Sequence, residues 1–363
     1  MLNKFTPIDQ LLKAAKRGEI FILVDDERRE NEGDLVFLGE KCSPKKINFM
    51  AKYGRGLICL ALDKKQSSKL GLKLMPSSNF SRFSTAFTVS IEARRGVTTG
   101  ISAYDRSKTI LTAIKKNSSK KDIVTPGHIF PLVSRDGGVL IRAGHTEASV
   151  DIAKLTKKNH SAVICEIMNE DGTMAKRDQL FKFAKKHKLK ISKIEDLIEY
   201  RFKKENFLKL KSKKTFKFKK NILEKQIFHN SIDKNKHLVF SKITNKTNCK
   251  VRVLSIKDKL SQNIFNNKDV KNSLSYLNKS KNFSLIVIQS SVMKEDKNFI
   301  NFSGNKREFE ANLIRNYGVG AQIIKKLGLN DIILVTKSKK RIVGLDGFGI
   351  KIKKQEIFKW KNA

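Results

Sequence analysis

Cysteine, proline and tryptophan are scarce in this sequence, which has four, five and one of them among 363 residues. The cysteines, Cys42, Cys59, Cys165 and Cys249, are widely spaced and form no Cys-x-x-Cys pair. Such spacing excludes the disulfide framework of small secreted domains and a zinc site of the usual pattern, and it is typical of reduced cytosolic thiols. No apolar run has the length of a signal peptide or of a membrane span, which needs ~20 residues. We therefore expect a cytoplasmic protein without a membrane partner.

Acidic residues are also few: 35 Asp and Glu stand against 76 Lys and Arg, and the formal net charge is +41. Residues 1–200 carry 37 basic and 23 acidic side chains, whereas the remaining 163 residues carry 39 and 12. A nucleic-acid-binding surface would explain the excess. The lysines are, however, spread among Asn, Phe and Ile without a zinc-finger or RNP-like signature, which favours compositional drift at exposed positions. We expect no specific nucleic-acid partner, and the length indicates two or three domains.

Residues 25–34, here called the acidic segment, read Asp-Asp-Glu-Arg-Arg-Glu-Asn-Glu-Gly-Asp, so six of ten are carboxylates. Apolar runs at 21–24 and 35–38 predict two buried strands joined by this segment, with Gly33 easing the turn. Carboxylates at this density raise one another's pKa unless cations neutralise them. The internal arginines do part of this, and a hard divalent cation such as Mg²⁺ could do the rest. A solvated acidic hairpin loop is the alternative.

Periodicity predicts alternating helices and strands in the first 200 residues. Pro7 and Gly18 bracket an amphipathic helix. The other predicted elements are helices at 44–53 and 105–116 and strands at 57–62, 86–91 and 162–168. Residues 201–285 are rich in Lys, Asn and Ser and show weak periodicity. Order returns with strands at 284–289 and 331–336, a Gly-rich turn into an amphipathic helix within 311–327, and a turn at 344–349 before a last strand. The second part therefore indicates a small α/β domain.

Three polar stretches are candidates for chemistry. Glycines, hydroxyls and arginines at 94–106 suit an anion-binding loop, although a plain loop capped by Asp105 or Ser107 is the alternative. Residues 125–128 read as a tight connection, in which a lone His128 would ordinarily be structural. A helix starting within 139–152 would aim its N-terminal amides and Arg142 at an anion, with His145 in reach of a metal. Glu166 lies in an apolar strand and needs a partner or an acid–base role.

Six motifs follow one another in the first part of the chain: DDERRENEGD (25–34), RGLICLAL (55–62), FTVSIEARRGVTTGISAYDR (87–106), TPGHIFPL (125–132), RAGHTEASVDIAKL (142–155) and CEIMNEDGTMA (165–175). In this order they resemble the 3,4-dihydroxy-2-butanone 4-phosphate synthase family, which supplies the four-carbon unit of riboflavin. The resemblance implies a homodimeric lyase that binds ribulose 5-phosphate and Mg²⁺ (or Mn²⁺) and expels the fourth carbon as formate after enolisation and rearrangement.

Carried over position by position, the resemblance assigns roles. Glu30 and His145 would be metal ligands, with Glu32 supporting them, and His128 and Glu166 would be the catalytic acid–base pair. The substrate would be bound by Arg29, Glu30, Asp34, Arg142, Ala143, Gly144, His145, Thr146 and Glu166.

Residues from about 210 onward resemble GTP cyclohydrolase II only in part. Val251-Arg252-Val253-Leu254-Ser255 and 315–329 match its segments. Ile256 and Lys257 stand where the first zinc cysteine is expected, no Cys-Asp-Cys pair follows, and Leu313 replaces a catalytic Asp although Arg315 persists. The resemblance therefore implies a degenerate domain that binds no zinc and does not hydrolyse GTP.

The fold expected is α+β: a mixed α/β sandwich synthase domain at 1–205, followed by a smaller α/β cyclohydrolase II-like domain at 210–363. One alternative is a bifunctional enzyme whose second site uses non-standard ligands. Another is a nucleic-acid-binding or scaffolding protein that keeps only the fold.

Overall fold

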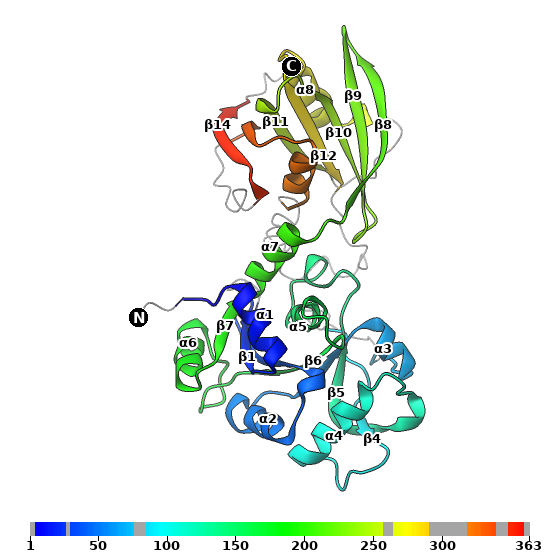
Figure 1. Cartoon of the computed structure of the whole chain (residues 1–363), viewed down its shortest axis with the longest axis vertical. Coiled ribbons are helices and arrows are strands. Elements are labelled where there is room, and N and C mark those ends of the chain that lie inside the picture. The colour runs from blue at the N-terminus through cyan, green and yellow to red at the C-terminus, as the bar shows by residue number, and fades with distance from the viewer. Residues whose placement is uncertain are drawn as a thin grey trace. The chain divides into compact units, whose positions relative to one another are not determined.

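Two seven-stranded sheets organise the chain, one in each of two units, Met1–Ile198 and Glu199–Ala363 (Figure 1). The computed structural model describes residues 4–26, 30–75, 85–256, 264–289, 318–338 and 348–358. Among these residues, no helix is both long and apolar enough to cross a membrane. The expected α+β class with two domains is confirmed.

The sheet of the first unit is mixed, with strand order β4-β5-β3-β6-β2-β1-β7. Only the β1–β7 and β3–β5 pairs are parallel. Its strands are β1 (Phe21–Val24), β2 (Gly33–Leu38), β3 (Cys59–Leu62), β4 (Ile91–Ala93), β5 (Ile123–Val133), β6 (Ser161–Glu166) and β7 (Lys190–Lys193). The acidic segment therefore connects two neighbouring antiparallel strands, as its flanking apolar runs predict.

Helices cover both faces of this sheet. The helices of the unit are α1 (Ile8–Arg17), α2 (Pro44–Phe49), α3 (Lys64–Lys69), α4 (Ala103–Ala113), α5 (His145–Leu155) and α6 (Arg177–Lys186), with single turns at Gly39–Lys41, Met50–Gly54, Lys120–Asp122 and Gly138–Leu140. Helix α7 (Ile194–Lys204) begins in this unit and ends in the second. Helix α1 buries Leu11, Ala14 and Ala15 and ends at Gly18, whose φ of +87° is open to glycine.

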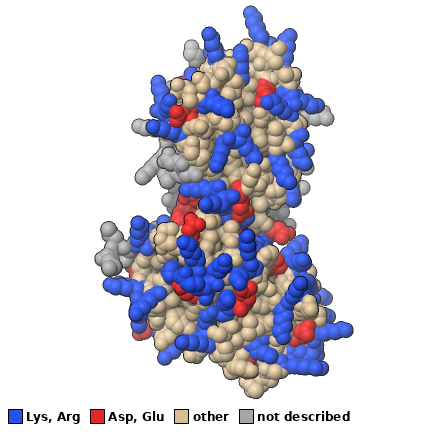
Figure 2. Space-filling view, in the orientation of Figure 1, with Lys and Arg blue, Asp and Glu red and all other residues tan. Residues whose placement is uncertain are grey.

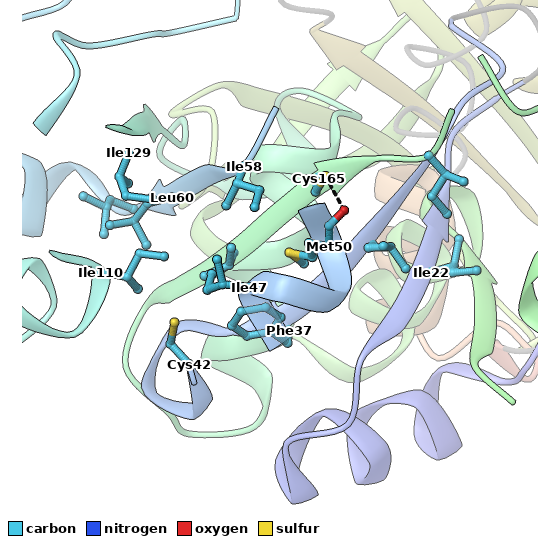
Figure 3. Close-up of a cluster of buried hydrophobic side chains, with 14 of the residues drawn as sticks. Ile22, Phe37, Cys42, Ile47, Met50, Ile58, Leu60, Ile110, Ile129 and Cys165 are labelled. Atoms are coloured by element: carbon cyan, nitrogen blue, oxygen red, sulfur yellow. Dashed lines mark hydrogen bonds between the residues drawn. The ribbon is translucent and has the colours of Figure 1, made fainter. Parts of the chain in front are cut away.

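One hydrophobic cluster of the first unit lies on one face of the sheet, and Phe21, Leu23, Val36 and Leu38 are fully buried on the other. The cluster joins Phe37 and Leu60 of the strands to Ile47 of α2 and Ile110 of α4 (Figure 3). Cys165 is buried in it, with its Sγ 3.9 Å from the Met50 carbonyl oxygen. Helix α5 contacts β1, β2, β3 and β6 without contributing to this cluster, so it covers the opposite face.

Several local expectations need correction. Residues 86–91 do not form one strand. Phe87 bridges to Leu132 and Thr88 to Leu74, and β4 begins only at Ile91. Residues 125–128 are not a connection but lie within the long strand β5. Helix α4 is capped by Ser102, whose hydroxyl accepts the Asp105 N–H, and neither Asp105 nor Ser107 is the cap.

The second unit is also sheet-centred, with order β14-β13-β11-β12-β10-β9-β8. Its elements are β8 (Leu208–Phe218), β9 (Asn221–Asn230), β10 (Lys236–Lys242), β11 (Thr247–Ile256), α8 (Lys268–Leu277), β12 (Phe283–Gln289), β13 (Asp331–Thr336), β14 (Lys351–Ile357) and a turn at Ile264–Asn266. Residues 201–285 are thus largely strand, despite their weak periodicity. In the edge strand β8, for example, the lysines are exposed, whereas Ser212, Phe216 and Phe218 are half-buried.

One helical stretch, 318–326, packs against the chain that enters the second unit. Gln322 Nε2 donates to the carbonyl oxygens of Phe202 and Glu205 at 2.7 Å each. A side chain at Gly318 would lie 2.5 Å from the Phe202 ring. The fold around this segment is therefore built as expected, whereas Leu313, Arg315 and the turn at 344–347 lie outside the described residues.

Basic side chains are scattered over the visible face of each unit, with acidic ones between them (Figure 2).

Candidate active site

Strand register brings two predicted site carboxylates side by side. Asp34 of β2 pairs with Glu166 of β6. Their neighbours Leu35 and Cys165 belong to the apolar core. Because side chains alternate across a strand, Asp34 and Glu166 point to the other face, which α5 covers.

The acidic segment closes on the start of α5. One ligand atom from each of Asp25, Glu30 and His145 lies within 4.8 Å of the other two, and among the described residues no other group of three has this arrangement. Asp25 shapes the turn, since its carboxylate accepts the N–H groups of Glu30 at 3.2 Å and of Glu32 at 2.9 Å. His145 also lies 4.0 Å from a Glu30 oxygen and 3.9 Å from an Asp34 oxygen.

These donors fit a divalent cation. Oxygen ligands of Mg²⁺ lie at about 2.1 Å, so opposed ligands are about 4.2 Å apart. The three donor atoms, all within 4.8 Å of one another, are close to this spacing. A second sign is electrostatic: burial, and then the charges of Glu166, Glu30, Asp25 and Glu32, raise the pKa of Asp34 well above its usual range. Burial and the Glu30 charge raise the pKa of Glu32. A bound cation would offset this repulsion.

Glu166 is fixed by the backbone opposite it. Its Oε2 accepts the Leu57 N–H at 2.9 Å. A Cβ at Gly56 would lie 2.6 Å from that oxygen, so the glycine is what lets the chain pass so close. The carboxylate that the sequence places in an apolar strand thus has a backbone partner at the strand's end.

His128 lies at the same end of the sheet as Glu166. Cys59 pairs with Phe130 on one side and Ile164 on the other, and His128 and Glu166 are each two residues beyond these partners, on the strands that flank β3. The His128 ring is 42% exposed, and its Nδ1 lies 2.7 Å from Glu92 Oε2.

The N-terminus of α5 carries the predicted anion-binding residues. Gly144 precedes the helix, and His145 and Thr146 open it, both buried. Arg142 lies two residues before Gly144, separated from it by Ala143. Its Nη1 donates to Glu147 at 2.7 Å and its Nη2 to the Thr85 hydroxyl at 3.1 Å. The guanidinium is therefore held beside the helix amides, where a phosphate is favoured.

The loop at 94–106 is held by its own carboxylate. Asp105 accepts the N–H groups of Thr98 and Gly100 and the Thr98 hydroxyl, at 2.7–3.2 Å. Two amides that could have bound an anion are thus used internally, so the loop's geometry favours a rigid support over an anion site.

The structure thus brings together Glu30, Asp34, His145 and Glu166, keeps His128 at the same end of the sheet, and gathers Arg142, Ala143, Gly144 and Thr146 at one helix end. Arg29 lies outside the described residues. Sequence reasoning missed Asp25 and Glu92. Glu92 had a readable signal, because it is a carboxylate in an apolar strand, as Glu166 is.

The second unit gathers no comparable group among its described residues. Cys249 is buried in β11, and burial raises the pKa of its thiol to about 12. His237 is fully buried in β10. Ser255 and Ile256 end β11, and Asp269 forms an exposed ion pair with Lys337 at 3.1 Å.

Family models match both units. Residues 9–200 match the 3,4-dihydroxy-2-butanone 4-phosphate synthase model, and residues 210–356 match the GTP cyclohydrolase II model. A relative named 3,4-dihydroxy-2-butanone 4-phosphate synthase from Wolinella succinogenes is 40% identical, over 95% of each chain. A relative from Aquifex aeolicus named riboflavin biosynthesis protein RibBA is 37% identical, over 96% of this chain and 91% of its own.

Solved structures agree. RibBX, a two-domain 3,4-dihydroxy-2-butanone 4-phosphate synthase from A. baumannii, superposes with a TM-score of 0.79 at 33% identity, covering 98% of this chain and 100% of its own. A 3,4-dihydroxy-2-butanone 4-phosphate synthase in complex with two magnesium ions has a TM-score of 0.53 at 35% identity, covering 55% of this chain and 98% of its own.

Proposed function

The chain belongs to the 3,4-dihydroxy-2-butanone 4-phosphate synthase family, with a synthase domain fused to a GTP cyclohydrolase II domain, and we propose that its first unit converts D-ribulose 5-phosphate to L-3,4-dihydroxy-2-butanone 4-phosphate and formate with Mg²⁺ bound. This is the synthase reaction of riboflavin biosynthesis. The observation that carries the proposal is the convergence of Asp25, Glu30 and His145 beside the Asp34–Glu166 pair.

We assign the cation to Glu30 and His145, with Asp25 as a third donor and Glu32 supporting the turn. Mn²⁺ would suit the same donors. When bound there, the cation supplies Lewis-acid polarisation of the substrate's carbonyl oxygen. The two products together contain all the carbon, hydrogen, oxygen and phosphorus atoms of the substrate, so the overall reaction needs neither net water nor a redox cofactor.

The remaining steps belong to side chains. Arg142 and the α5 amides around Gly144 and Thr146 would hold the phosphate, and Asp34 and Arg29 would contact the sugar hydroxyls. Enolisation needs a group to take a proton from carbon and a group to return one, and His128 and Glu166 have these roles. They stand on β5 and β6, on opposite sides of β3, which suits two groups that act on different atoms of the substrate.

We further propose a homodimer with its sites close to the subunit contact. Leu57, Ile101 and Tyr104 are large apolar side chains with exposures of 41%, 55% and 62%. Leu57 holds Glu166 through its N–H, and Ile101 follows Gly100, which packs on His128. An apolar rim around a polar site is typical of a covered surface. Light scattering of the purified chain tests this.

For the second unit, we propose loss of GTP cyclohydrolase activity. The cysteine that persists, Cys249, is inside the sheet, and the end of β11 offers Ser255 and Ile256 rather than a thiolate. The alternative is a bifunctional enzyme with other ligands.

One experiment tests both assignments. The purified full chain is incubated with ribulose 5-phosphate or with GTP, each with Mg²⁺ or Zn²⁺ varied, and formate is measured. Formate from the sugar phosphate that EDTA abolishes is the expected result. Formate from GTP, with about one zinc per chain by elemental analysis, would contradict the proposed inactivity of the second unit.

A further inference from the structure

We propose that Glu92 is a positioning residue that fixes the ring of His128 and keeps the proton of the neutral imidazole on Nδ1, so that Nε2 is the proton-accepting atom. The inference rests on the acid–base role proposed for His128 and adds to it the residue that prepares that ring.

The contact between the two residues is double. Glu92 Oε2 accepts the backbone N–H of His128 at 3.2 Å and lies 2.7 Å from its Nδ1. Glu92 is 8% exposed, whereas the His128 side chain is 42% exposed. The carboxylate is thus a buried anchor, and the ring it holds reaches toward solvent.

The second oxygen of Glu92 is also bound. The Thr109 hydroxyl of α4 forms a short hydrogen bond with Glu92 Oε1. The same hydroxyl oxygen accepts the Ala93 N–H at 3.0 Å, so its single proton is available to Glu92. Both carboxylate oxygens are therefore satisfied from defined directions, which limits the rotation of the carboxylate.

A glycine closes over this pair. A Cβ at Gly100 would lie 2.1 Å from Glu92 Oε2 and 2.5 Å from His128 Nδ1, and the φ of this residue is +90°. Asp105 holds Gly100 in place by accepting its N–H at 3.1 Å. The Nδ1 edge of the ring is therefore enclosed by Glu92 and Gly100.

The proton position follows from the acceptor. Because a carboxylate facing Nδ1 can only accept, the neutral imidazole keeps its proton there and presents a lone pair at Nε2. When Nε2 takes a proton from the substrate, the nearby negative charge of Glu92 stabilises the imidazolium. The bond at Nδ1 is unchanged by the transfer.

Kinetic assays of variants distinguish the contribution of the Glu92 charge from that of its shape. We expect Glu92→Gln to lower kcat at least tenfold with KM changed little, since the carboxylates that orient metal-bound histidines in the same way contribute about 10–100-fold. Thr109→Val should have a smaller effect in the same direction, and Thr109→Ser should restore activity. The matched control is Glu40→Gln, a part-buried carboxylate that likewise binds a backbone N–H and a side-chain nitrogen, those of Asn159 and Lys158.

Nitrogen NMR provides a readout that does not depend on turnover. In the full-length protein at neutral pH, the His128 signals, identified by their loss in His128→Gln, should be those of an Nδ1–H tautomer. In Glu92→Gln the Nδ1–H signal should shift or the two tautomers should mix.

Two results would overturn the proposal: an Nε2–H tautomer in the wild type, or a Glu92→Gln enzyme with kcat within twofold of the wild type. If the wild type released no formate from ribulose 5-phosphate, the proposed function would fail instead, and the NMR result would still decide the tautomer.

Discussion

The two units bury ionisable groups in different ways. In the first, Asp25, Asp34, Glu30 and His145 come from three elements and face one another within a few ångströms. In the second, each buried group has its own surroundings. Arg252 donates to Ser273 at 2.8 Å and to the Val335 carbonyl oxygen at 3.3 Å, and it lies over the Phe358 ring.

His237 is a second buried ionisable group of this unit that is isolated from the others. It is fully buried in β10, and burial, followed by the charge of His229, lowers the pKa of its imidazole to about 4. The comparison teaches that a buried charge alone indicates little. Convergence of several such groups, at a cost in stability, is what indicates chemistry.

The largest effect that tests this difference between the units is expected in the acidic segment. We expect Asp25→Asn and Glu30→Gln each to lower formate release on the order of 10³-fold, about 4 kcal/mol, and to weaken Mg²⁺ binding, because each removes a cation ligand. Magnesium titration and formate assays measure this. Asp26→Asn, an exposed neighbour in the same segment, is the control. Near-normal activity in both variants with unchanged magnesium dependence would remove the metal assignment.

The next largest effect concerns proton transfer. Glu166→Gln and His128→Ala should each lower kcat by about 10²–10⁴-fold, the usual contribution of a general acid or base. Steady-state kinetics on folded variants measure this. A change limited to KM would mean that these residues bind substrate only.

The pH dependence of stability tests the isolated buried histidine of the second unit. The unfolded chain protonates His237 near 6.5 and the folded chain only near 4, so the unfolded state binds more protons between these values. The contribution of neutral His237 to the free energy of unfolding is therefore fully present above pH 6.5. It is lost as the pH falls toward 4, by up to about 3 kcal/mol. Urea unfolding should show this loss, and His237→Leu should flatten it. An equal pH dependence in the variant would assign the loss to other groups.

Backbone packing around His128 gives a smaller effect. Gly100→Ala should cost about 1–3 kcal/mol of stability, and it should lower activity because the new methyl group displaces Glu92 and His128. Gly172→Ala is the matched control: its φ is +84°, but no atom lies within 4 Å of the added methyl group. If both variants lose activity equally, then strain rather than contact with His128 is responsible.

The smallest effect is expected at a surface ion pair of the second unit. Asp269 and Lys337 are about half exposed and 3.1 Å apart. Asp269→Asn should change the free energy of unfolding by less than about 1 kcal/mol, in thermal unfolding at low salt. A larger loss would mean that this exposed carboxylate is coupled to the buried Arg252.

Local sequence signals predicted much of the synthase unit. Apolar runs on both sides of the acidic segment located β1 and β2, and a Pro–Gly pair located α1. Glu166 was visible as a carboxylate in an apolar strand. Asp25 could not be separated from its neighbours, because its role depends on a turn that brings Glu30 to His145, more than a hundred residues away. Glu92 was missed because its partner His128 lies on another strand.

The second unit was harder to predict from its sequence. Lysines occupy the outward positions of β8 and weaken the alternation that marks a strand. Pairing with β9 along the whole length decides the structure there, and that pairing is a tertiary contact.

Strand alternation makes the synthase unit sensitive to single-codon insertions. Asp34 faces the site only because Leu35 faces the core, and the same holds for Glu166 and Cys165. One extra residue within β2 would turn every side chain on one side of it to the opposite face. Two extra residues would restore the phase. Insertions of two codons into β2 or β6 should therefore be tolerated better than insertions of one, whereas conservative substitutions of the core-facing residues Leu35 and Cys165 should have small effects.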